Sequence, residues 1–175
     1  MKAIDVVTRA RSAMTAGTCQ YKLGMGGGDP TRAVPWNDDG QCDCSGFVAW
    51  CLNLPRKTDH PWYIEQNGGW LETTAIQRDI QRDEAGIFRR IADSKAYPGC
   101  IIVYGDAGSK QGHVGIVASV GHDRILTVIH CSKGNYAAHD DAIWETDPAV
   151  FLNHHALVGT CVFIDPEWEK EYDEV

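Results

Sequence analysis

The sequence predicts an α+β domain in which helices come first and an antiparallel sheet follows. Residues 3–14 and 44–52 repeat apolar side chains at helical spacing. From residue 100 onward, short runs rich in Val and Ile alternate with turn residues, which is typical of strands. The chain has 175 residues, of which 43% are hydrophobic, so we expect residues 1–175 to form a single domain with a substantial core.

The first helix is predicted over residues 3–14, because the alanines and valines of this segment fall on one face. Residues 16–43 are rich in Gly, Pro, Asn and Asp and are predicted to form a long loop that lines a functional site. The second helix is predicted to begin at Cys44, with Asp43 as its N-cap, and Pro55 marks its end.

A second loop is predicted over residues 53–71, followed by a short helix within residues 73–83 that has a threonine cap. The later part of the chain is predicted to fold as strands, with an acidic surface tail after residue 165. The predicted strands are residues 100–105, 113–120, 124–130 and 155–164.

The composition excludes several classes of function. The formal net charge is −8 and no basic cluster is present, which argues against a nucleic-acid-binding surface and against docking on anionic lipid. No apolar stretch reaches the roughly 20 residues of a membrane span, so membrane insertion is not expected. Residues 1–14 lack the continuous apolar core of a signal peptide, so we expect synthesis in the cytoplasm.

Cys44 is the candidate nucleophile. A helix N-terminus carries unpaired N–H groups and a partial positive charge, which favour a thiolate and lower a cysteine pKa below its free value of about 8.5. The N–H groups of the same turn can stabilise an oxyanion, and the small residues Ser45 and Gly46 leave room for a substrate. Ser45 is therefore a candidate for oxyanion or substrate binding.

His113 and His130 are candidates for the base and its orienting partner, because they lie at the outer ends of two consecutive strands. A two-residue turn at Gly121-His122 would set them directly opposite one another. A four-residue turn would leave them diagonal neighbours on the same face, and only an odd-length loop or a bulge would separate them. Asn135 is a rival for the orienting role, in a predicted turn.

The seven cysteines are an odd number and most lie in apolar strings, so reduced thiols are expected. Cys51, Cys100 and Cys161 are predicted to be core residues. The roles of Cys42 and Cys131, which flank the predicted site, stay open. Cys42 with Cys44 could form one half of a metal site and His130 with Cys131 the other half, but zinc sites usually have roughly two to four residues between cysteines. No metal and no cofactor is expected.

The motifs "DCSGFV", "PGCIIVYGD…GHVGIV" and "VIHCSKG" resemble those of the NlpC-type cell-wall cysteine peptidases, which share a papain-like core with the CHAP amidases. The resemblance covers residues 21–132. It implies a nucleophile helix packed on an antiparallel sheet, with Cys44 as nucleophile, His113 as base and His130 as the third member. It also implies that Tyr21, in "YKLGMGG", contributes to the oxyanion hole, although it stands further upstream than usual.

The resemblance implies a peptidoglycan hydrolase that cuts an amide bond in a stem peptide, most typically the γ-D-glutamyl-diaminopimelate bond. Without a signal peptide, such an enzyme would reach the cell wall or periplasm by a non-Sec route. A phage lysis enzyme (an endolysin) fits this, as does an injected antibacterial effector with an immunity or inhibitor protein as partner. The alternatives are a thiol-dependent acyltransferase or deamidase acting on a lipid or protein, and a non-catalytic binding module.

Overall fold

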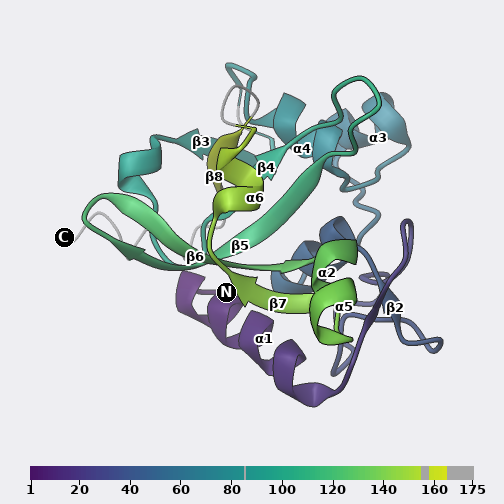
Figure 1. Cartoon of the computed structure of the whole chain (residues 1–175). Coiled ribbons are helices and arrows are strands. Elements are labelled where there is room, and N and C mark those ends of the chain that lie inside the picture. Colours follow the sequence, from purple (N-terminus) through teal and green to yellow (C-terminus); the bar gives the residue numbers. More distant parts are fainter. Residues whose placement is uncertain (85, 155–157, 165–175) are drawn as a thin grey trace.

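The core of the protein is a six-stranded antiparallel sheet in the order β3-β8-β4-β5-β6-β7 (Figure 1). The computed structural model describes residues 1–84, 86–154 and 158–164. The predicted α+β class is confirmed. The strands are β3 (Phe88–Ile91), β4 (Ile101–Tyr104), β5 (His113–Gly121), β6 (Arg124–Cys131), β7 (Ile143–Thr146) and β8 (Gly159–Phe163).

The helices surround this sheet, with α1 below its β5–β6–β7 part and α6 above it in the view of Figure 1. A short parallel pair, β1 (Gln20–Tyr21) and β2 (Gln41–Cys42), lies ahead of α2. The helices are α1 (Ala3–Ala16), α2 (Cys44–Cys51), α3 (Pro61–Asn67), α4 (Thr73–Asp79), α5 (Lys133–His139) and α6 (Ala149–Leu152), with one 3-10 turn, η1 (Asp93–Lys95).

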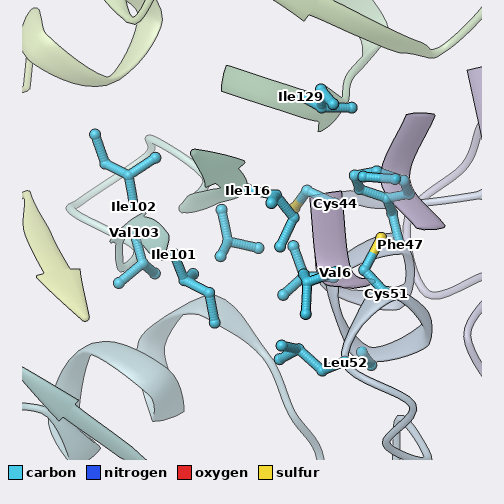
Figure 2. Packing of buried hydrophobic residues seen from close by; sticks show 14 of the residues in the cluster. Val6, Cys44, Phe47, Cys51, Leu52, Ile101, Ile102, Val103, Ile116 and Ile129 are labelled. Atoms are coloured by element: carbon cyan, nitrogen blue, oxygen red, sulfur yellow. The ribbon is translucent and has the colours of Figure 1, made fainter. Parts of the chain in front are cut away.

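Helix α2 is buried along its whole length and packs against β5 and β6. Figure 2 shows Cys44, Phe47 and Cys51 in the same apolar cluster as Ile116 of β5 and Ile129 of β6. The predicted core positions of Cys51, Cys100 and Cys161 are confirmed, since all three are fully buried. The first residue of α2 is therefore fixed against the sheet by the packing of the residues behind it.

Several predicted elements differ from the structure. The predicted loop over 53–71 contains α3, which begins at Pro61, and the predicted threonine cap of α4 is replaced by Glu72, whose carboxylate accepts from the N–H groups of Thr74 and Ala75. Asn135 lies in α5 and not in a turn, while β1, β2, β3, β7 and α6 had no counterpart in the sequence prediction. These elements are all short, so hydrophobic periodicity could not mark them.

The β5–β6 hairpin turns at His122-Asp123 and not at Gly121-His122. Both turn residues have positive φ angles, 52° and 58°, as a two-residue type I′ turn requires. The pairing register shifts by one residue between Val117 and Ser119. It shifts back between Ser119 and Val120, so the two irregularities cancel. The pairing Ile116↔Ile129 is thus the diagonal alternative, which keeps the two histidines on one face.

Among the residues that the structure describes, no helix combines the length and hydrophobicity of a membrane span. The predicted acidic tail lies outside the described residues.

Candidate active site

Cys44 occupies the first turn of α2, where the sequence predicted the nucleophile. Asp43 caps the helix as predicted, because its Oδ1 accepts from the N–H of Gly46 at 2.8 Å. The backbone N–H groups of Val114 and Ser45 form hydrogen bonds with the Cys44 sulfur. The sulfur therefore lies against the peptide bond that joins His113 to Val114, at the start of β5.

A glycine-rich loop closes over this helix end. A Cβ on Gly27 would stand 2.2 Å from the Gly46 carbonyl oxygen, and a Cβ on Gly26 would stand 2.3 Å from the Cys42 sulfur. The amide of Gly24 donates to Asp43 Oδ2 at 2.6 Å. Close packing on Cys42 and on the first turn of α2 therefore explains Gly26 and Gly27, whereas a Cβ on Gly24 or Gly28 would meet nothing within 4 Å.

Arg56, which the sequence did not single out, locks this loop to α2. Its guanidinium forms a buried ion pair with Asp43, and it also donates to the carbonyl of Met25 at 2.7 Å and to Ser45 Oγ at 3.2 Å. A lone arginine in a loop carries no local signal, because its role depends on contacts with residues far away in the sequence. The pair holds the segment before Cys44 in place.

We expect Arg56→Met to lower the free energy of unfolding by about 3–5 kcal/mol, because it leaves the Asp43 carboxylate buried without its counter-ion. Urea denaturation monitored by circular dichroism measures this change. The matched control is Arg32→Met, since the ion pair of Arg32 with Asp38 is exposed and is worth less than about 1 kcal/mol. Equal losses in the two variants would show that the buried pair has no special weight.

His113 and His130 meet on one face of the β5–β6 hairpin. Nε2 of His113 lies 2.8 Å from Nδ1 of His130, and the ring planes are nearly perpendicular. Gly115 makes room for this contact, because a Cβ there would lie 3.0 Å from the Cβ of His130. The prediction that the two imidazoles share a face is confirmed.

Further contacts of the two histidines come from residues that follow β6. Phe151 of α6 stacks on His113, with ring centroids 5.0 Å apart, and also packs edge-on against His130. His130 Nε2 lies 3.0 Å from the hydroxyl of Thr146. Asn135, the rival orienting residue, donates instead to the backbone carbonyl of His130 at 2.9 Å. Asn135 therefore holds the backbone of His130 and does not contact its imidazole through this bond.

The shifted pKa values indicate that Cys44, His113 and His130 are all uncharged at neutral pH. Burial raises the pKa of the Cys44 thiol to about 12, and the negative charge of Asp43 acts in the same direction. Burial lowers the pKa of His113 to about 3, helped by His130, and burial also lowers that of His130 to about 4. The expected lowering of the Cys44 pKa is wrong, because burial outweighs the effect of the helix N-terminus and the Asp43 carboxylate adds to the rise.

These shifts predict that stability falls with acidity. At neutral pH both imidazoles are neutral whether the chain is folded or not. As the pH falls from about 7 to about 5, histidines in the unfolded chain take up protons while the buried His113 and His130 do not, so the free energy of unfolding decreases.

Urea titrations across this range test the prediction, with His130→Asn expected to flatten the pH dependence. His122→Asn is the control, because that imidazole is exposed in the hairpin turn and asparagine tolerates its backbone conformation. A His130→Asn variant with the wild-type slope would contradict the assignment.

Two adjoining hollows flank the catalytic candidates. One, of about 440 Å³, is bordered by Cys44; the other, of about 260 Å³, is bordered by His113. The two share Tyr21, Gln111 and Gly112 as lining residues. We call them together the Cys44–His113 cleft. The first hollow is also lined by Leu23, Gly24, Asp43, Ser45, Arg56, Asn67, Trp70 and Glu72.

Tyr21 and Ser45, the candidates for oxyanion or substrate binding, both line this cleft. Pairing of β1 with β2 sets Tyr21 beside Cys42, which compensates for its distance from Cys44 in sequence. The Ser45 hydroxyl donates to Asp43 Oδ1 at 3.2 Å and accepts from Arg56, so its side chain belongs to the capping network. The backbone N–H remains the group through which Ser45 can act on a substrate.

Cys42 and Cys131 lie with Cys19 in a cluster of buried, reduced thiols. The Cys131 thiol donates to the carbonyl of Cys42 at 3.5 Å, and the Cys42 sulfur supports the loop at Gly26. In the part of the chain that the structure describes, no group of three or more His, Cys, Asp or Glu side chains is arranged to hold a metal ion. Packing accounts for these two cysteines.

The comparisons with known proteins agree with this geometry. A family model for the CHAP domain matches residues 34–135. The chain belongs to the CHAP domain family. The matched part of this CHAP domain contains Cys44, His113 and His130, whereas Tyr21 lies ahead of it. The resemblance predicted from the motifs is confirmed at the level of the CHAP family, and the family indicates a hydrolase, an amidase or peptidase.

No curated protein matches the CHAP domain described here. Among solved structures, NlpC2 from Trichomonas vaginalis aligns with 91% of this chain and 46% of its own, with 20% sequence identity and a TM-score of 0.45. The chain thus spans about half the length of that protein.

Proposed function

We propose that this CHAP domain is a cysteine endopeptidase that hydrolyses an amide bond in the stem peptides of peptidoglycan. The observation that carries the proposal is the 2.8 Å contact between His113 and His130 at the same cleft that Cys44 borders. A nucleophile, a base and a group that orients the base are the components that nucleophilic amide hydrolysis requires.

The reaction begins when the Cys44 sulfur attacks the amide carbonyl and its proton passes to Nδ1 of His113. Because both groups are neutral at rest, this transfer accompanies the attack and does not precede it. The first-turn N–H groups of α2, together with the Tyr21 hydroxyl, stabilise the oxyanion. His113 then protonates the leaving amine, and water activated by His113 hydrolyses the thioester.

The substrate features are proposed from the family resemblance and from the cleft. The γ-D-glutamyl-diaminopimelate bond is the proposed scissile bond, and the cleft offers Trp70 beside Cys44 as a surface for an extended peptide. The net charge of −8 disfavours electrostatic attachment to anionic wall polymers. Delivery by phage lysis or by injection into a rival cell, with an immunity protein as partner in the second case, completes the proposal.

Incubation of the purified protein with diaminopimelate-containing sacculi tests the function. Mass spectrometry of the soluble products is expected to show fragments with a newly exposed diaminopimelate amine. Fragments that begin at L-alanine would instead indicate cleavage next to the sugar.

The Cys44→Ala variant serves as the blank in this assay. A mass increase of about one unit per amide, without new fragments, would indicate a deamidase. No change in the sacculi relative to the blank would refute peptidoglycan as the substrate.

A further inference from the structure

A line of hydrogen bonds crosses three neighbouring strands and ends on the backbone. His113 of β5 contacts His130 of β6 through Nε2 and Nδ1 at 2.8 Å, and Nε2 of His130 lies 3.0 Å from Thr146 Oγ1 on β7. The Thr146 hydroxyl in turn donates to the carbonyl of Asp147 at 2.8 Å. The register explains the alignment, because His130 pairs with Trp144, which puts Thr146 one diagonal step away.

The carbonyl at the end of this line determines where each proton lies. A carbonyl oxygen can only accept a hydrogen bond. The threonine hydroxyl has a single proton, and it donates that proton's hydrogen bond to the backbone carbonyl of Asp147. Thr146 Oγ1 must then accept from Nε2–H of His130. A neutral His130 that is protonated at Nε2 has a bare Nδ1, so it accepts from Nε2–H of His113. His113 is left with a bare Nδ1.

We propose that Thr146 is a positioning residue that fixes the tautomer of the His130–His113 pair, so that Nδ1 of His113 is free to take the proton from Cys44. This inference rests on the function proposed above. The opposite direction of the line would put a proton on Nδ1 of His113 and leave the nucleophile without a base. Thr146 thus acts through His130 and touches neither substrate nor nucleophile.

The proton balance is simple. When Nδ1 of His113 receives the thiol proton, His113 becomes an imidazolium that still donates from Nε2 to His130. His130 keeps its own Nε2–H on Thr146, so no proton travels along the line and the imidazolium gains a polarised acceptor. Phe151 covers both rings, which hinders water from replacing the hydroxyl. The Nδ1 proton later leaves with the amine.

Thr146→Val and Thr146→Ser test the proposal, because valine keeps the branched shape without the hydroxyl and serine keeps the hydroxyl. With sacculi as the probe, Thr146→Val is expected to lower kcat about 10- to 100-fold with little change in KM, and Thr146→Ser to stay within about 3-fold of wild type. Thr127→Val is the matched control, since Thr127 on β6 bonds Ser119 and Glu145 and does not contact the histidines.

Imidazole ¹⁵N chemical shifts provide a readout that does not depend on activity. Wild type is expected to show protonated Nε2 and bare Nδ1 at both His113 and His130, and Thr146→Val to show mixed tautomers. A wild-type spectrum with a proton on Nδ1 of His113 would overturn the proposal even if the variants failed to fold. Thr146→Val with wild-type kcat and unchanged shifts would do the same. If wild type leaves sacculi intact, the proposed substrate fails while the shifts still decide the role of Thr146.

Discussion

Replacing Cys44 with alanine is expected to abolish the release of fragments from sacculi and to leave the fold in place. Hydrolysis through a thioester needs the sulfur, so the rate should fall by at least about 10⁴-fold, to the level that binding and oxyanion stabilisation alone supply. Alanine keeps the first turn of α2 and the Asp43 cap, because that cap uses the N–H of Gly46 and no atom of the Cys44 side chain. Product analysis and circular dichroism measure the two effects.

Cys51→Ala is the matched control for this experiment. Cys51 is fully buried at the other end of α2, where loss of its sulfur leaves a small cavity worth about 1 kcal/mol of stability. Turnover per folded molecule should stay normal. Substantial activity in Cys44→Ala would falsify the nucleophile assignment, and a folded but inactive Cys51→Ala would show that the two cysteines have been assigned the wrong roles.

Replacing His113 with alanine is expected to cost nearly as much rate as losing the thiol, because nucleophile and base act as a unit. His130→Ala should cost less, since it removes only the partner that accepts from Nε2 of His113. His130→Asn or His130→Gln should recover part of that loss, because an amide oxygen can accept the same proton. Initial rates on sacculi, compared across the series, measure the hierarchy.

Asn135→Ala separates the two candidates for the orienting role. Asn135 bonds the carbonyls of His130 and Ala142, so its loss should lower stability more than the rate per folded molecule. An inactive, stable Asn135→Ala beside a fully active His130→Ala would transfer the orienting role to Asn135.

The parts of the site that the sequence predicted are those with a local signal. A cap residue followed by an apolar helical pattern marked Asp43 and Cys44. An even-length turn in the hairpin keeps His113 and His130 on the same face of the sheet. The turn itself was misplaced by one residue, because both Gly121-His122 and His122-Asp123 are compatible with a tight turn. The shared face did not depend on that choice.

The parts that the sequence could not provide depend on contacts between distant segments. Arg56 matters only because it reaches Asp43 and Met25, and Thr146 matters only because β7 pairs with β6. Burial was the other missing quantity. It reversed the expected direction of the Cys44 pKa, since the position of a residue on a helix does not reveal how much of the molecule surrounds it.

The closure of the glycine loop over α2 bears on how small a working enzyme can be made. A shortened protein that began at residue 34, where the family match begins, would lack Tyr21 and the backbone around Met25 that receives Arg56. Asp43 would also lose the amide of Gly24. Cys44, His113 and His130 would still be encoded, but the wall of the cleft on the Tyr21 side would be missing. In this CHAP domain, the segment that matches the family, residues 34–135, is therefore shorter than the segment that lines the Cys44–His113 cleft, which includes Tyr21.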